Sequence, residues 1–121
     1  MIYTYFETAH FTRRVVELLD DEVYRRLQND LRDNPSKGAV IPGCGGIRKV
    51  RVDHSERGKG KRGGCRVIYL HVPEAQRIYF VAIYSKDEHD DLTAEQKKVL
   101  KAIAEQTKET LRVKPRRKRK D

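Results

Sequence analysis

Basic side chains gather in the middle of this chain, at spacings that let several of them act together. Residues 48–66 hold eight Lys and Arg against two Asp and Glu, a net charge of +6. The eight are Arg48, Lys49, Arg51, Arg57, Lys59, Lys61, Arg62 and Arg66. Such a set attracts phosphate groups by charge, and each guanidinium can add paired hydrogen bonds. We therefore expect a polyanion as the ligand, and RNA before other polyanions.

These residue types can also cleave RNA without a metal. RNA carries its own nucleophile, the 2′-hydroxyl. The protein has to hold that group in line with phosphorus, move protons and stabilise a pentavalent phosphate. Because neighbouring cations disfavour a protonated ammonium, a lysine in such a set can act as base or acid. We predict that Lys49 and Arg51 orient the scissile region, with Lys49 a candidate base. Arg66 would stabilise the phosphorane, and Lys86 would contact a phosphate or act as the acid.

Other chemistries fit the residues less well. The four His and two Cys offer no pair at a usual metal-ligand spacing, so no metal and no cofactor are expected. Residues 58–61 lack the spacing of a P-loop and the helix that must follow it. Cys65 has no His partner marked by the sequence, so we expect it to be structural.

The distribution of charge separates a scaffold from two basic segments. The chain has 121 residues and a net charge of +9, which suits one compact domain. Residues 112–121 also carry a net +6, which leaves −3 for the rest of the chain. We expect residues 1–111 to form the domain and residues 112–121 a basic, disordered tail. No signal peptide and no membrane-length apolar run is found, so a cytoplasmic protein is expected.

The first elements follow from the hydrophobic pattern. Residues 2–6 are rich in aromatic and β-branched side chains, which predicts a strand. Thr8 reads as the N-cap of a helix, and Asp20 begins a second helix that Asn34 and Pro35 end. Residues 35–46 are expected to form a long connection rich in turns.

Three more strands and a last helix complete the predicted fold. The strands are expected at residues 47–52, 65–72 and 77–84, and the last is the most hydrophobic, which predicts a central strand buried on both faces. Residues 93–96 match a capping box. The helix after it carries an apolar stripe made of Val99, Leu100, Ile103 and Leu111. We predict an α+β fold in the order β-α-α-β-β-β-α: two helices on a small, mostly antiparallel sheet, plus a C-terminal helix.

Strand alternation sorts the basic residues of the first of these strands. With a period of two, Lys49 and Arg51 share one face, and Val50 and Val52 face the core. Arg66 lies just inside the next strand, so the cations are expected to meet on one concave patch.

The chain resembles the RelE/ParE superfamily of bacterial type II toxins, and within it most closely the HigB-type toxins. The resemblance rests on residues 46–51, 57–69, 83–88 and 92–97 together with the order of the elements. It implies a RelE-like domain that cleaves mRNA in the ribosomal A site and so stops translation. It also implies a cognate antitoxin, in HigB systems a HigA-type helix-turn-helix protein, with DNA contacted only through that complex.

The resemblance also assigns positions. Lys49 and Arg51 match the basic residues of the family's second strand, Arg66 an arginine of the third strand, and Lys86 a basic residue after the last strand. The residues expected to grip ribosomal RNA are Arg48, Arg57, Lys59, Lys61 and Arg62.

Two positions depart from the family pattern. Cys65 stands where an aromatic residue often precedes the arginine, which removes a stacking surface for a base. Residues 92–121 contain no Tyr, although some members carry one near the C-terminus. Tyr84, Lys86 or Lys49 would then take over its part in proton transfer.

Two other functions are compatible with the same fold. A ParE-like inhibitor of DNA gyrase would have no nuclease activity, but it would not need basic residues at these sheet positions. A non-catalytic RNA-binding module would bind RNA in a salt-dependent way and leave it intact.

Overall fold

The computed structural model describes residues 2–53, 64–86, 88 and 91–111. The elements in chain order are β1 (Thr4–Glu7), α1 (Ala9–Leu18), α2 (Asp21–Asp33), β2 (Ala39–Val40), β3 (Arg48–Val52), β4 (Cys65–Val72), the 3-10 turn η2 (Pro73–Ala75), β5 (Arg77–Ser85) and α3 (Ala94–Thr110). The predicted α+β fold is confirmed. The connection predicted over residues 35–46 also contains β2, a strand that the sequence analysis did not predict. Two residues are too few to show a periodic pattern, so only pairing with β3 reveals this strand.

The strands form one mixed sheet in the order β1-β5-β4-β3-β2. β1 runs parallel to β5, and every other pairing is antiparallel. β5 is interior, as its hydrophobicity predicted, but the middle strand is β4. Both strands are covered on their two faces, so hydrophobicity alone does not rank them.

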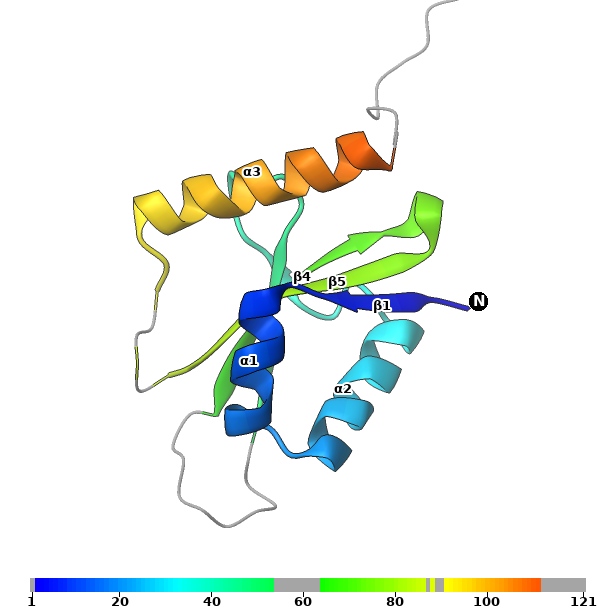
Figure 1. The fold of residues 1–121 in the computed structure, drawn as a ribbon, viewed down its shortest axis with the longest axis vertical. Coiled ribbons are helices and arrows are strands. Elements are labelled where there is room, and N and C mark those ends of the chain that lie inside the picture. Colours follow the sequence, from blue (N-terminus) through cyan, green and yellow to red (C-terminus); the bar gives the residue numbers. More distant parts are fainter. Residues whose placement is uncertain (1, 54–63, 87, 89–90, 112–121) are drawn as a thin grey trace, which may run out of the picture.

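Helices cover both faces of this sheet. Figure 1 shows α1 and α2 on one side of the strands and α3 on the other. Phe11 of α1, Leu27 of α2 and Val67 of β4 belong to the core on the first side. Leu100 of α3 packs with Ile68 and other residues in a second core on the opposite side. The sheet is therefore the middle layer of three.

Side-chain caps fix where the helices begin. Thr8 accepts a hydrogen bond from the backbone N–H of Phe11, and Asp20 accepts one from Val23. Thr93 and Gln96 form the predicted capping box at the start of α3. These caps satisfy amide groups that the helices themselves leave without acceptors.

The predicted stripe of α3 is right in part. Leu100 is buried, and Ala104, four residues on, is the other buried position of this helix. Val99 is 58% exposed, which corrects its assignment to the core. A spacing of four keeps Leu100 and Ala104 on one helix face, and Val99 falls at the edge of that face.

Several predictions concern residues outside the described part of the chain. The tail of residues 112–121 lies there. So do four of the predicted RNA-binding residues, which are Arg57, Lys59, Lys61 and Arg62. Among the described residues, no helix has the length and apolar character that crossing a membrane requires.

Candidate active site

Three of the predicted site residues stand in one row across the sheet. Arg66 of β4 pairs directly with Arg51 of β3 on one side and with Tyr84 of β5 on the other. Directly opposite residues on neighbouring strands point to the same face, with Cβ atoms about 5 Å apart. The sheet therefore brings together two guanidinium groups and a phenol, although Arg51 and Tyr84 are 33 residues apart in sequence.

Lys49 extends this row along β3. It pairs with Ile68, which in turn pairs with Ala82. Ile68 and Tyr84 both belong to the core under α3, so Lys49 and the row lie on the α3 face. Val50 and Val52 pack on the α1–α2 side, as strand alternation predicted. We refer to Lys49, Arg51, Arg66 and Tyr84 as the cationic row.

The cationic row places two positive charges opposite each other. Arg51 and Arg66 are direct cross-strand partners, and like charges in that position repel. Arg51 is exposed, while Lys49 and Arg66 are partly exposed, so their charged groups can reach solvent. A bound phosphate would relieve the repulsion by lying between the two guanidinium groups.

A cavity of about 500 Å³ adjoins the row at Tyr84. Tyr84 is only 5% exposed and forms part of its wall. Apolar side chains of β4, β5 and α3 make up most of the rest, among them Ile68, Ala82 and Leu100. Polar side chains from α1, the turn after β5 and α3 also line it, namely His10, Arg14, Glu88 and Gln96. Sequence reasoning missed this cavity, because its walls come from four separate segments that show no common motif.

Lys86 is placed by the backbone of two strands. It follows β5 directly, is exposed, and its backbone N–H donates to the carbonyl oxygen of Gly64 at 3.1 Å. Gly64 has a φ of +64°, and an added Cβ would lie 2.2 Å from the carbonyl oxygen of Val52. Glycine is thus required where β3, β4 and the turn carrying Lys86 meet.

Arg48 does not join the row. It pairs with Tyr69 on the α1–α2 side of the sheet. Its guanidinium donates to the carbonyl oxygens of Gly38, at 2.7 Å, and Ser36, at 3.3 Å. Arg48 therefore binds the segment before β2, and the same guanidinium would have to leave these carbonyl oxygens to bind RNA as predicted.

Tyr69 and His71 of β4 share this structural region. Burial raises the pKa of the Tyr69 hydroxyl, while its hydrogen bond with Gly38 and the nearby charge of Arg48 lower it less. Burial also lowers the pKa of His71, with Arg48 adding to the effect and Glu74 opposing it. Both side chains are consequently neutral near pH 7.

Cys65 points away from the cationic row. It is 1% exposed and packs in the α1–α2 core, and its thiol faces the carbonyl oxygen of Leu18 at 3.9 Å. An aromatic residue at this position would be buried among those helices. The expectation that Cys65 removes a stacking surface for a base is thus wrong. Both cysteines are buried, and neither forms a disulfide.

The described residues contain no cluster of three or more His, Cys, Asp or Glu able to hold a metal ion. The groups on the α3 face are instead guanidinium, ammonium and phenol. Those groups can bind a phosphodiester, stabilise added negative charge and exchange protons.

Comparison with known proteins agrees with this architecture. Residues 5–115 match the family described as the RelE toxin of the RelE / RelB toxin-antitoxin system. The chain belongs to the RelE toxin family. It is therefore a member of a toxin family from toxin-antitoxin systems, and the superfamily expected from the sequence is confirmed.

Two solved structures share the fold at low sequence identity. A chain of the intact E. coli RelBE toxin–antitoxin complex superposes with a TM-score of 0.51 at 14% identity, over 69% of this chain and 96% of that one. A mutant of E. coli RelE in the free state superposes with a TM-score of 0.52 at 15% identity, over 74% of this chain and 90% of that one. At these identities the likeness establishes the fold.

Proposed function

We propose that this RelE-family protein is a metal-independent endoribonuclease that cleaves mRNA in the ribosomal A site. The observation that supports it best is the cationic row, in which Arg51 and Arg66 oppose each other beside Tyr84. Two adjacent guanidinium groups suit the dianionic phosphorane that forms when a 2′-hydroxyl attacks phosphorus.

Each residue has a distinct part in this mechanism. Lys49 and Arg51 hold the scissile phosphate in line, and Lys49 takes the 2′-hydroxyl proton. Arg66 stabilises the phosphorane from the centre of the row. Lys86, at the end of β5, contacts a phosphate or protonates the 5′-oxygen. Tyr84 is nearly buried, so its part is to form the floor between Arg66 and the cavity, where an unstacked base can lie.

We further propose that a cognate antitoxin of the HigA type neutralises the protein, and that HigB-type toxins are its nearest group. The RelBE complex supports the existence of such a partner for this fold. Ribosomal RNA would be held by the basic loop residues expected from the sequence. DNA would be contacted only through the antitoxin.

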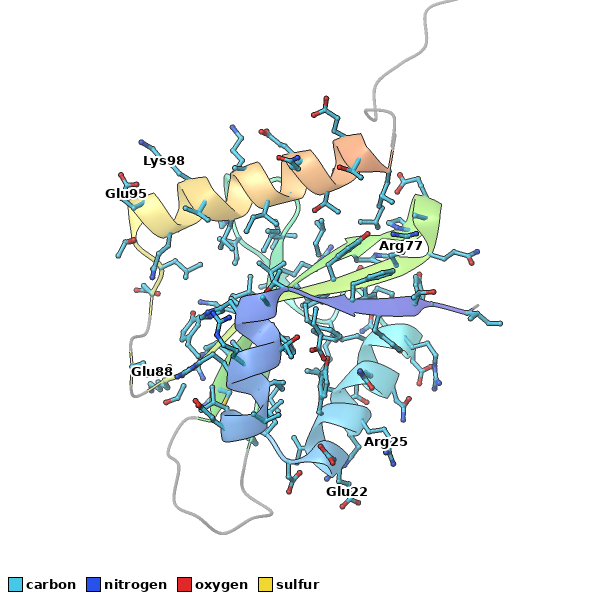
Figure 2. The ribbon with its side chains drawn as sticks, in the orientation of Figure 1. Glu22, Arg25, Arg77, Glu88, Glu95 and Lys98 are labelled. Carbon is cyan, nitrogen blue, oxygen red and sulfur yellow. The ribbon has the colours of Figure 1, made fainter. Side chains whose placement is uncertain are left out.

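A cleavage assay on a defined mRNA, with and without ribosomes, tests the proposal. Arg66→Ala should lower the cleavage rate by about 100- to 1000-fold, the range found when one preorganised donor to a developing anion is removed. Arg25→Ala serves as the control, because Arg25 is exposed on α2, on the other side of the sheet (Figure 2). The wild-type protein should cleave only on ribosomes.

Other results would favour the alternatives. Intact mRNA in both arms, with inhibition of gyrase supercoiling, would favour the ParE-like function. Salt-dependent RNA binding without cleavage would favour a binding module. A folded Arg66→Ala protein that cleaves at the wild-type rate would disprove the role of Arg66.

A further inference from the structure

A short turn after β5 fixes the backbone around Lys86. The N–H of Glu88 donates to the carbonyl oxygen of Ser85 at 3.0 Å. The N–H of Ser85 donates to the Glu88 carboxylate oxygen Oε1 at 2.9 Å. Glu88 thus closes the turn twice, once with its backbone and once with its side chain. Lys86 lies within this closed turn, and its own N–H is bound to Gly64.

The other oxygen of the same carboxylate reaches a helix. Arg14 of α1 donates through Nη2 to Oε2 of Glu88 at 2.5 Å, across 74 residues of sequence. Figure 2 shows Glu88 beside α1. Arg14 also contacts Glu17, one turn further along α1, at a longer 3.4 Å. One carboxylate therefore joins the end of β5 to α1, while the other stays within the helix.

Stability alone does not account for this contact. The Glu88 side chain is 41% exposed and that of Arg14 28%, and half-exposed ion pairs stabilise proteins little. A carboxylate next to a set of cations that bind RNA also opposes binding by its charge. An arrangement with little gain in stability and a cost in binding suggests a positional use.

The contact lies beside the cationic row. Arg14 and Glu88 both line the cavity that Tyr84 also lines. Tyr84 is the strand partner of Arg66, and it precedes Lys86 by two residues. The ion pair thus stands at the point where the row, the cavity and the turn carrying Lys86 meet.

We propose that Glu88, anchored by Arg14, is a positioning residue for the RNA-cleaving site, which holds the turn of Lys86 in register with the cationic row. This inference rests on the proposed function. It gives the site a component that acts through the turn of Lys86 and that comes from α1 and the turn after β5. It also implies opposite effects on binding and on turnover, because the carboxylate aids geometry and weakens attraction for RNA.

Glu88→Gln and Glu17→Gln form a matched pair of variants. Each removes one negative charge next to Arg14, but only Glu88→Gln changes the bridge to the turn. Single-turnover cleavage on programmed ribosomes, at several toxin concentrations, separates the maximal rate from the half-saturating concentration. For Glu88→Gln we expect the maximal rate to fall about 10- to 100-fold, with a half-saturating concentration equal to or below that of the wild type. For Glu17→Gln both quantities should stay within about twofold of the wild type.

A second variant guards against a folding artefact. Arg14→Lys keeps the charge of the anchor but loses the two-pronged guanidinium, so it should also lower the maximal rate without weakening binding. If Glu88→Gln does not melt like the wild type, Arg14→Lys takes its place in the test. A lower maximal rate with an unchanged or lower half-saturating concentration would then support the inference, and a wild-type rate would overturn it.

The outcomes separate this inference from the proposed function. A wild-type protein that does not cleave on ribosomes would overturn both. A wild-type protein that cleaves, with Glu88→Gln at the wild-type rate, would overturn the inference and leave the function standing. If the maximal rate falls equally in Glu88→Gln and Glu17→Gln, the loss of a negative charge explains the effect, and the inference is also overturned. A fall in rate confined to the Glu88 and Arg14 variants would support it.

Discussion

The hydroxyl of Tyr69 offers a quantitative test of how the sheet is held to the segment before β2. Tyr69 is fully buried on β4. Its hydroxyl donates to the carbonyl oxygen of Pro35 at 2.7 Å and accepts the N–H of Gly38 at 2.9 Å. Tyr69→Phe removes both bonds without changing the ring. We expect this variant to be less stable than the wild type by several kilocalories per mole.

The size of the loss follows from the surroundings of the two partners. The Gly38 N–H is buried, and a buried donor left without an acceptor costs about 1–3 kcal/mol. The Pro35 carbonyl is only partly buried, so losing its hydrogen bond costs about 1 kcal/mol. Together the expected loss in unfolding free energy is about 2–4 kcal/mol. With a urea m-value of about 1–2 kcal/mol/M, the midpoint should fall by roughly 1–4 M.

Tyr5→Phe is the matched control for this experiment. The Tyr5 hydroxyl donates to the carbonyl oxygen of Gln28 at 2.8 Å. Gln28 lies inside α2, where its carbonyl also accepts the helical bond and so keeps a partner. The expected loss is about 0.5–1.5 kcal/mol. Urea unfolding followed by circular dichroism measures both variants. A Tyr69→Phe protein no less stable than Tyr5→Phe would refute the reasoning about the buried N–H of Gly38.

Two further predictions concern other parts of the fold. Gly64→Ala should lose about 2 kcal/mol or more of unfolding free energy, because its backbone is left-handed and an added Cβ clashes with Val52. Gly43→Ala is the control: its backbone is also left-handed but the space around it is open, so it should lose about 1–2 kcal/mol. Equal losses for the two variants in thermal unfolding would contradict the clash. The lowered pKa of His71 means that the unfolded chain binds more protons below about pH 6.5, so stability should fall as pH falls through that range. His71→Gln should flatten this slope in urea titrations between pH 7 and 5, and an unchanged slope would rule out His71 as its source.

Much of the local structure was determined by the sequence itself. Caps at Thr8 and Asp20, and the capping box of Thr93, set helix starts that the structure confirms. These signals are local, because a cap acts on amides two or three residues away. Alternation along β3 likewise placed Lys49 and Arg51 on one face, since the strand period holds for any strand with a buried side.

The tertiary structure decided which residues are cross-strand partners in the sheet. The sequence puts Arg66 early in β4, but only the register sets it between Arg51 and Tyr84. Register depends on how three strands pack between two helical layers, and a shift of one residue would turn every side chain to the other face. The same holds for Cys65, whose burial under α1 follows from that register.

The cavity and its ion pair could not be predicted from the sequence. Arg14 is partly exposed and Glu88 is exposed, each in its own segment, and no motif links them across 74 positions. They meet because β1 pairs in parallel with β5, which brings α1 back beside the end of that strand. Residue types and short spacings thus determined which chemistry this protein can perform. Long-range packing alone decided which groups stand together to perform it.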